Sequence, residues 1–132
     1  MIVVDASVLA NALGDDYQAG RVARDALRRA SDLAAPDLVD VEAVSVLRKR
    51  WLTGALSSQQ FETAAANLER LDFERVPTLR LMRRAFELRA NVTAYDASYV
   101  ALAEALDCEL LTGDRRLATA PGLRCPVRVL SV

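Results

Sequence analysis

The chain has 132 residues, a formal net charge of −1 and no histidine, with 17 lysines and arginines set against 18 aspartates and glutamates. Without histidine there is no Ser-His-Asp triad, no histidine acid–base pair and no histidine-ligated zinc, and the near-neutral charge argues against a simple basic coat protein for nucleic acid. Because 52% of the residues are apolar, we expect one folded domain over residues 1–132.

Short apolar runs alternate with amphipathic stretches along the chain. In chain order, the expected elements are a strand at 2–4, helices at 7–13 and 18–31, a strand at 33–36, helices at 37–52 and 57–68, a strand at 72–76, helices at 77–89 and 93–106, a strand at 109–112, a short helix after 113–114 and a strand at 127–130. The strands lack a polar–apolar alternation, which is typical of a parallel sheet buried on both faces. The expected fold is therefore α/β with three layers, a mostly parallel sheet of about five strands between two layers of helices.

Several residues mark where these helices begin and end. Ser7 opens the first helix, and Asp37 is placed to cap the third, which Gly54 ends. Ser57 and Gln60 have the spacing of a capping box at the start of the fourth helix. These signals predict two separate helices between the second and third strands.

Four acidic residues are expected at one edge of this sheet. Asp5 directly follows the first strand and Asp114 the fourth, and the carboxyl ends of parallel strands lie at the same edge. Glu42 lies in the first turns of the helix that begins at this edge, and Asp96 reaches the edge if its own helix starts there. Taken singly, three of these acids also have a structural explanation: Asp5 as a turn residue, Asp96 as the capping partner of Thr93, and Asp114 as a helix N-cap.

Taken together, the four acids indicate a metal site. Two carboxylates about 4 Å apart repel each other by roughly 4 kcal/mol at an effective dielectric constant of about 20, so a cluster must be protonated, bridged by cations or bound to a metal. In a chain without histidine, carboxylates favour a hard cation such as Mg²⁺ or Mn²⁺. Such an ion activates water and neutralises charge on a phosphoryl oxygen, which points to metal-assisted hydrolysis of a phosphodiester.

Four segments carry a resemblance to a known family. They are IVVDASVL at 2–9, APDLVDVEAVSVL at 35–47, AYDASYVALAEAL at 94–106 and LLTGDRRLA at 110–118. In this order they resemble the PIN-domain family, and specifically the VapC toxins of bacterial type II toxin–antitoxin pairs. The resemblance implies a ribonuclease that cuts tRNA, rRNA or mRNA, is inhibited by a VapB antitoxin, and forms homodimers or larger toxin–antitoxin complexes.

The resemblance also implies roles for individual residues. The catalytic acidic quartet that holds Mg²⁺ or Mn²⁺ is matched by Asp5, Glu42, Asp96 and Asp114. Ser7 and Thr112 match small hydroxyl residues that support the quartet. Some other PIN nucleases carry a further acid just after the last aspartate, where this chain has Arg115 and Arg116, so the resemblance implies one metal site and leaves a second in doubt.

Basic and apolar residues near these positions have two interpretations each. Arg115 and Arg116 are candidates to bind a substrate phosphate through their forked donors, and residues 48–50 are a second candidate for the RNA path. Both runs are also typical of a solvated helix face, as is Asn11, one turn beyond Ser7. A further set forms either core or a groove for an antitoxin helix, namely Tyr17, Trp51, Leu52 and Phe61.

Two other functions stay open. A degenerate nuclease fold would bind RNA or a protein partner without cleaving it, although all four acids are present. An Asp-based phosphotransfer domain would use Asp5 as phosphoryl acceptor and would need a nearby lysine. The single lysine, Lys49, lies in the middle of a helix, which argues against that alternative.

Two features bear on the compartment. Cys108 and Cys125 are too few for a disulfide framework and are expected as reduced, partly buried thiols. The chain shows neither a signal-type start nor an apolar run of membrane length. We therefore expect a cytoplasmic bacterial or archaeal protein.

Overall fold

The computed structural model describes residues 1–130 and is built on a five-stranded sheet in the order β3-β2-β1-β4-β5. The strands are β1 Ile2–Val4, β2 Leu33–Pro36, β3 Glu74–Val76, β4 Glu109–Thr112 and β5 Val127–Val129. All four neighbouring pairs are parallel, which confirms the expected sheet. The chain runs outward from β1 to β3 and then returns to β4 on the other side of β1, so the direction of winding switches between β1 and β4.

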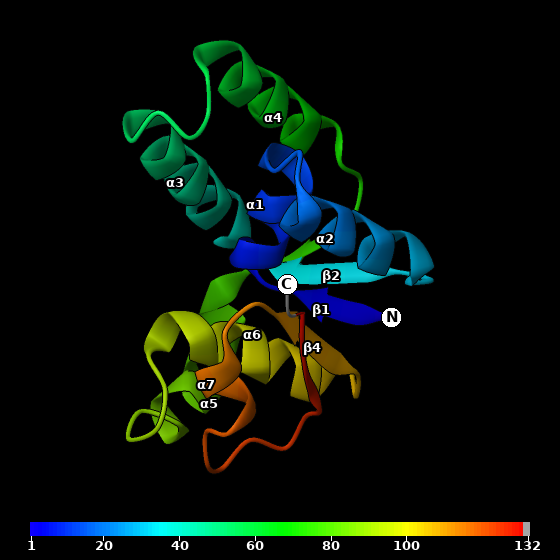
Figure 1. The fold of residues 1–132 in the computed structure, drawn as a ribbon. Coiled ribbons are helices and arrows are strands. Elements are labelled where there is room, and N and C mark those ends of the chain that lie inside the picture. Colours follow the sequence, from blue (N-terminus) through cyan, green and yellow to red (C-terminus); the bar gives the residue numbers. More distant parts are fainter. Residues whose placement is uncertain (131–132) are drawn as a thin grey trace.

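Helices cover both faces of the sheet, as the three-layer prediction requires (Figure 1). One layer contains α1 Ala6–Gly14, α2 Gln18–Arg29, α3 Val39–Leu52 and α4 Ser58–Arg70. The other contains the 3-10 helix η1 Thr78–Leu81, α5 Met82–Glu87 and α6 Ala94–Ala105. The short helix α7 Arg115–Ala118 packs against β5.

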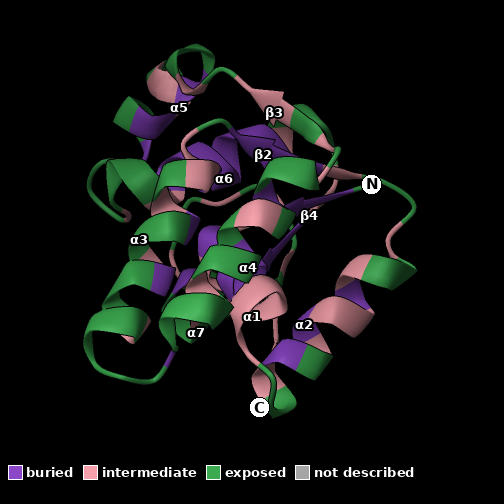
Figure 2. Ribbon diagram, turned by 90° about the horizontal axis from the view of Figure 1, so that it is seen from above, coloured by how far each residue is buried: buried purple, intermediate pink, exposed green. Residues whose placement is uncertain are grey.

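The core lies along the central strands and α6. Val3 and Val4 of β1 and Leu110 and Leu111 of β4 are fully buried, which explains why these strands show no polar–apolar alternation. Helix α6 packs across β1, β2 and β4, and the purple of buried residues marks both α6 and the central strands in Figure 2. Within residues 1–130 no helix is both long enough and apolar enough to cross a membrane.

Two predicted helix starts are wrong, the first because a neighbouring residue supplies the cap and the second because a residue distant in the sequence binds the expected cap. Helix α1 begins at Ala6 and is capped by Asp5, whose carboxylate accepts a hydrogen bond from the backbone N–H of Val8 at 3.1 Å, so Ser7 is not the cap. Asp37 does not cap α3, whose N-cap is Leu38 without a side-chain bond. The Asp37 carboxylate instead accepts hydrogen bonds from Thr78, which is 41 residues away in the sequence.

Other helix boundaries follow the sequence closely. The capping box of Ser57 and Gln60 is present in both directions, and Gly54 follows α3 with a φ of +84°, as glycine does at the end of many helices. The helix expected at 77–89 is divided into η1 and α5. Cys108 and Cys125 are free, half-buried thiols, as expected.

The start of α3 is fixed to the neighbouring strand and 3-10 helix. Asp37 accepts hydrogen bonds from the Thr78 hydroxyl at 2.6 Å and the Thr78 backbone N–H at 3.1 Å, and the Thr78 hydroxyl in turn accepts one from the Leu38 N–H at 3.3 Å. Arg75 of β3 makes a two-pronged ion pair with Asp40, at 2.7 and 3.1 Å. These contacts hold the first turn of α3 in place, immediately before Glu42.

Replacing Thr78 tests this junction. Thr78→Val is expected to lower the free energy of unfolding at neutral pH, because the hydroxyl bond to Asp37 is lost. The Thr78 bonds hold the pKa of Asp37 below its usual value, so their contribution is present above the unfolded-state pKa and disappears as the pH falls through the lower folded-state pKa. Urea unfolding at neutral and at acidic pH measures this difference.

The control is Thr63→Val, which makes the same change at an exposed position of α4. Its effect is expected to be small and independent of pH. A Thr78→Val effect that stays constant down to acidic pH would show that the junction does not depend on ionised Asp37.

Candidate functional site

The four predicted acids line one cavity at the switch point of the sheet. Asp5 follows β1 and Asp114 follows β4, while Glu42 and Asp96 lie in the first turns of α3 and α6, which approach from opposite faces. The cavity has a volume of about 510 Å³ and also includes Ser7. A crevice at this place is where open parallel sheets bind their ligands.

Asp5 is the most firmly held of the four. One oxygen, Oδ1, accepts hydrogen bonds from the Ser7 hydroxyl at 2.7 Å and from the Val8 N–H at 3.1 Å, and Oδ2 accepts one from the hydroxyl of the fully buried Thr112. Burial raises the pKa of Asp5, and these hydrogen bonds partly oppose the increase. The two predicted supporting residues, Ser7 and Thr112, therefore both contact Asp5 directly.

The same two hydroxyls also fix the turn that carries Asp114. Ser7 Oγ accepts a hydrogen bond from the Gly113 N–H at 3.2 Å, and Thr112 Oγ1 accepts one from the Asp114 N–H at 3.0 Å. A Cβ atom at Gly113 would lie 3.2 Å from Ser7 Oγ, so the absence of a side chain lets the turn approach closely. Asp5 and Asp114 are thus positioned by one shared network.

Glu42 is held across the cavity by a residue that the sequence analysis missed. The Tyr99 hydroxyl donates a hydrogen bond to Glu42 Oε1 at 2.5 Å, and Tyr99 is only 2% exposed. Burial raises the pKa of Glu42, the Tyr99 bond opposes this, and the negative charges of Asp96 and Asp5 add to it. Tyr99 lies three residues after Asp96, on the same face of α6, and this spacing is the signal in the sequence that points to it.

Asp96 and Asp114 lie in opposite electrostatic surroundings. Burial raises the pKa of Asp96, and the charges of Asp114 and Asp5 raise it further. Asp114 is paired with Arg116, whose Nε and Nη2 each lie 3.3 Å from a carboxylate oxygen, and this pairing lowers the pKa of Asp114. Arg115 and Arg116 are both exposed and lie outside the cavity, but only Arg116 is paired with a member of the quartet.

The basic run at 48–50 divides into three different environments. Lys49 lines the acidic cavity, Arg48 is exposed outside it, and Arg50 donates a hydrogen bond to Asn11 Oδ1 at 2.5 Å. Asn11 is therefore bound to α3 and not simply solvated. Because Lys49 and Asp5 line the same cavity, the mid-helix position of Lys49 is by itself no longer an argument against a phosphotransfer site.

The carboxylates that line the cavity suit a hard cation, although within residues 1–130 they do not already form a closed set of metal ligands. Among residues 1–130, no three acidic or cysteine side chains are gathered closely enough to hold a metal ion by themselves. The carboxylates line the walls of the cavity, and those of Asp5, Glu42 and Asp96 have raised pKa values. Mg²⁺ is commonly bound through one or two carboxylates and keeps several waters, so this arrangement suits Mg²⁺ or Mn²⁺ and the ion would relieve the excess negative charge.

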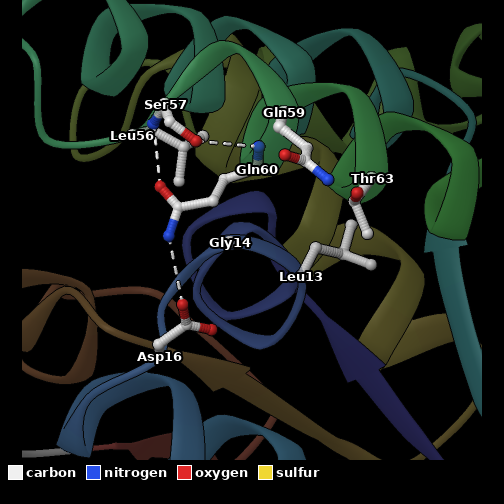
Figure 3. Close-up of a pocket in the computed structure, with 8 residues that line it drawn as sticks. All are labelled: Leu13, Gly14, Asp16, Leu56, Ser57, Gln59, Gln60 and Thr63. Carbon is white, nitrogen blue, oxygen red and sulfur yellow. Dashed lines mark hydrogen bonds between the residues drawn. The ribbon is translucent and has the colours of Figure 1, made fainter.

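A second hollow of similar size has no such chemistry. It has a volume of about 520 Å³ and lies between the end of α1 and the start of α4 (Figure 3). Gln60 spans it, accepting a hydrogen bond from the Ser57 N–H at 2.8 Å and donating one to Asp16 at 3.2 Å. Ser57, Gln60 and Asp16 are thereby bonded to one another across the hollow, which is a junction between helices.

Comparison with known proteins identifies the family. A family model described as "PIN domain" matches residues 2–123.

The chain belongs to the PIN-domain family.

Within this family the chain belongs to the VapC group. Ribonuclease VapC9 of Mycobacterium tuberculosis is 44% identical to it over 98% of both chains. Two solved structures share the fold. The Mycobacterium tuberculosis toxin VapC20, described as a sarcin-ricin loop cleaving toxin, has a TM-score of 0.70 at 18% identity over 93% of this chain and 96% of its own. VapBC2 from Rickettsia felis, bound to a promoter DNA fragment, has a TM-score of 0.69 at 14% identity over 99% and 100%.

The hydrogen bond between Thr112 and Asp5 is expected to stabilise the fold as well as the site. Thr112→Val removes the donor while keeping the shape of a fully buried side chain, so it leaves a charged oxygen without its partner. A double-mutant cycle with Asp5→Ala is expected to give a coupling energy of about 1.5 to 3 kcal/mol, the range for a hydrogen bond to a charged group. Urea unfolding of the four proteins provides the measurement.

The exposed Thr63→Val serves as the unlinked partner, for which the coupling with Asp5→Ala is expected to be near zero. If Thr112 and Asp5 couple no more strongly than Thr63 and Asp5, the shared network does not contribute to stability.

Proposed function

We propose that this protein is a metal-dependent endoribonuclease, the toxin of a VapBC-type toxin–antitoxin pair, and that it folds as a single PIN domain over residues 1–132. The observation that carries the proposal is that four carboxylates from four separate elements line one cavity at the switch point of the sheet. The residues assigned to catalysis and metal binding are Asp5, Glu42, Asp96 and Asp114. The name ribonuclease that the 44% identical VapC9 carries supports the same activity.

The four acids have different proposed roles, which follow from their different surroundings. A bound Mg²⁺ or Mn²⁺ would neutralise developing charge on the phosphoryl group and lower the pKa of a bound water. Asp5, whose orientation is fixed by three hydrogen bonds, is the best placed to hold the ion in one position. Asp114, kept ionised by Arg116, adds a second fixed negative charge.

Proton transfer falls to a carboxylate because the chain has no histidine. Glu42 and Asp96 have pKa values raised by burial and by neighbouring acids, and a general base works best when its pKa is closer to the working pH. Since Tyr99 occupies Oε1 of Glu42, Oε2 is the atom left to accept a proton from the attacking water. Tyr99 thereby orients the base without itself reacting.

The RNA substrate is a polyanion that must approach an acidic cavity. The cationic residues nearest to it are Lys49 in the cavity wall and Arg116 at its edge, with the exposed Arg115 next to Arg116. Arg115 and Arg116 are proposed to contact RNA phosphates, for which Arg116 would exchange part of its contact with Asp114. The proposed substrates are tRNA, rRNA or mRNA in the cytoplasm.

We also propose a VapB-type antitoxin as partner and a homodimer as the assembled toxin. Of the four residues whose place was open, Tyr17, Trp51 and Leu52 are exposed, by 79%, 41% and 57%, so they are not core. The rings of Trp51 and Phe61 lie 6.0 Å apart and line an apolar hollow of about 280 Å³ between α3 and α4. An amphipathic antitoxin helix binds such a surface through its apolar face.

Removing single carboxylates tests the catalytic proposal. Asp5→Asn and Asp96→Asn are each expected to lower the rate of RNA cleavage at least about a hundredfold, the usual cost of losing one charged contact to a transition state. Activity should disappear in EDTA and return with Mg²⁺ or Mn²⁺. Cleavage of a labelled RNA followed on a gel provides the measurement.

The matched control is Asp32→Asn, which removes an exposed acid just before β2, at the opposite edge of the sheet, and should cleave like the wild type. Metal-independent cleavage that survives Asp5→Asn would refute the proposal. Mn²⁺ binding measured by calorimetry separates a nuclease from a non-catalytic binding module, because a degenerate site would not bind the ion at millimolar concentration.

The antitoxin proposal predicts inhibition by a neighbouring gene product. Co-purification with a VapB-type antitoxin is expected to abolish RNA cleavage, and Trp51→Ala should weaken the complex because it removes most of the exposed aromatic surface next to Phe61. Analytical size-exclusion chromatography measures the complex, and Phe86→Ala, an exposed aromatic outside both that hollow and the acidic cavity, is the control. Equal loss in both variants would place the partner elsewhere.

A further inference from the structure

One face of α3 forms a wall of the acidic cavity over about two turns. Glu42, Ser45, Val46 and Lys49 all line the cavity, and steps of three, four and seven residues keep them on one side of a helix. At 1.5 Å per residue, Lys49 lies about 10 Å along the helix axis from Glu42. The helix therefore presents an acid at one end of this wall and a cation at the other.

Lys49 is an unpaired cation in an acidic cavity. It is the single lysine of the chain, its side chain is exposed, and within residues 1–130 it makes no salt bridge to any of the acids. The other candidate cations differ in this respect, because Arg116 is paired with Asp114 and Arg50 is bound to Asn11. Lys49 alone combines a place in the cavity wall with an unused charge.

A nucleic-acid strand carries a phosphate at every nucleotide, so a neighbour of the cleaved phosphate must lie along the cavity too. Carboxylates repel that neighbouring phosphate, whereas an ammonium group attracts it and releases its counterions. The bond from Arg50 to Asn11 at 2.5 Å fixes the adjacent turn of α3 to α1, which keeps the Lys49 backbone at a constant distance from Asp5. A phosphate held by Lys49 would therefore stand in a fixed relation to the acids.

We propose that Lys49 binds a phosphate of the RNA strand adjacent to the one that is cleaved, and so holds the strand across the acids. This inference rests on the proposed ribonuclease function and names a contact that positions the substrate backbone. Lys49 acts in binding and takes no part in the chemical step.

The first test compares Lys49→Gln, Lys49→Arg and Arg48→Gln on an oligoribonucleotide that the wild type cleaves at one position. Lys49→Gln is expected to raise KM roughly threefold to tenfold with little change in kcat, because the contact is the same in the ground and transition states. Lys49→Arg should restore KM, and Arg48→Gln, on the exposed side of α3, should resemble the wild type.

A salt titration distinguishes a phosphate contact from a structural effect. The slope of log affinity against log salt concentration is expected to fall by about 0.7 in Lys49→Gln, the value for one phosphate contact on a single strand. Mn²⁺ binding measured by calorimetry should be the same in Lys49→Gln and wild type. Loss of Mn²⁺ binding, or equal effects of Lys49→Gln and Arg48→Gln, would overturn the proposal.

A methylphosphonate scan locates the contact. Each phosphate of the oligonucleotide is replaced in turn by an uncharged methylphosphonate, and binding is followed by fluorescence anisotropy in an Asp96→Asn background. A methylphosphonate at one position beside the cleaved bond should weaken binding to the protein that retains Lys49. The same replacement should leave binding to the Lys49→Gln variant unchanged. Identical profiles in the two proteins would refute the contact. Failure of the wild type to cleave any RNA would instead refute the proposed function, and the binding profiles would still decide whether Lys49 holds a phosphate.

Discussion

The partly buried carboxylate of Asp5 connects the fold to the site. It caps α1, accepts a hydrogen bond from Thr112 of β4 and shares the Ser7 hydroxyl with the turn before Asp114. Burying a carboxylate is unfavourable unless hydrogen bonds replace the lost water, and here three donors do so. Since these donors come from α1 and from the adjacent strand, the same contacts that join β1 to β4 also give Asp5 a single orientation.

The other acids are held by elements that the sheet keeps rigid. Helix α3 is fixed at its first turn by Arg75 and Thr78, and α6 is packed across three strands. Glu42 and Asp96 are thereby kept near Asp5 although their charges repel one another. Burial raises the pKa of both carboxyls, and the repulsion between the acids raises it further. The rigid scaffold opposes this repulsion, and a bound cation would remove it.

The positive charges are distributed unevenly around this cavity. Arg116 is bound to Asp114 and lowers its pKa, Arg50 holds Asn11 on α1, and Lys49 keeps an unused charge in the wall. Although the net charge of the chain is only −1, the charges around the cavity are unevenly arranged. The acids lie at one end and the ammonium group of Lys49 lies at the other. Such a gradient suits a polyanion that must present one phosphate to the acids and hold the next one away from them.

The parallel sheet was predictable from the sequence, because short strands without alternation are typical of burial on both faces. The shared edge of Asp5 and Asp114 was predictable too, because parallel strands end together. The capping box of Ser57 was predictable because both of its partners lie within one turn. Which groups pair across the fold depended instead on tertiary packing. Tyr99 donates a hydrogen bond to Glu42, 57 residues away in the sequence, and Thr78 donates one to Asp37, 41 residues away. Contacts of this length depend on how α3, α6 and β3 pack, which no local spacing contains.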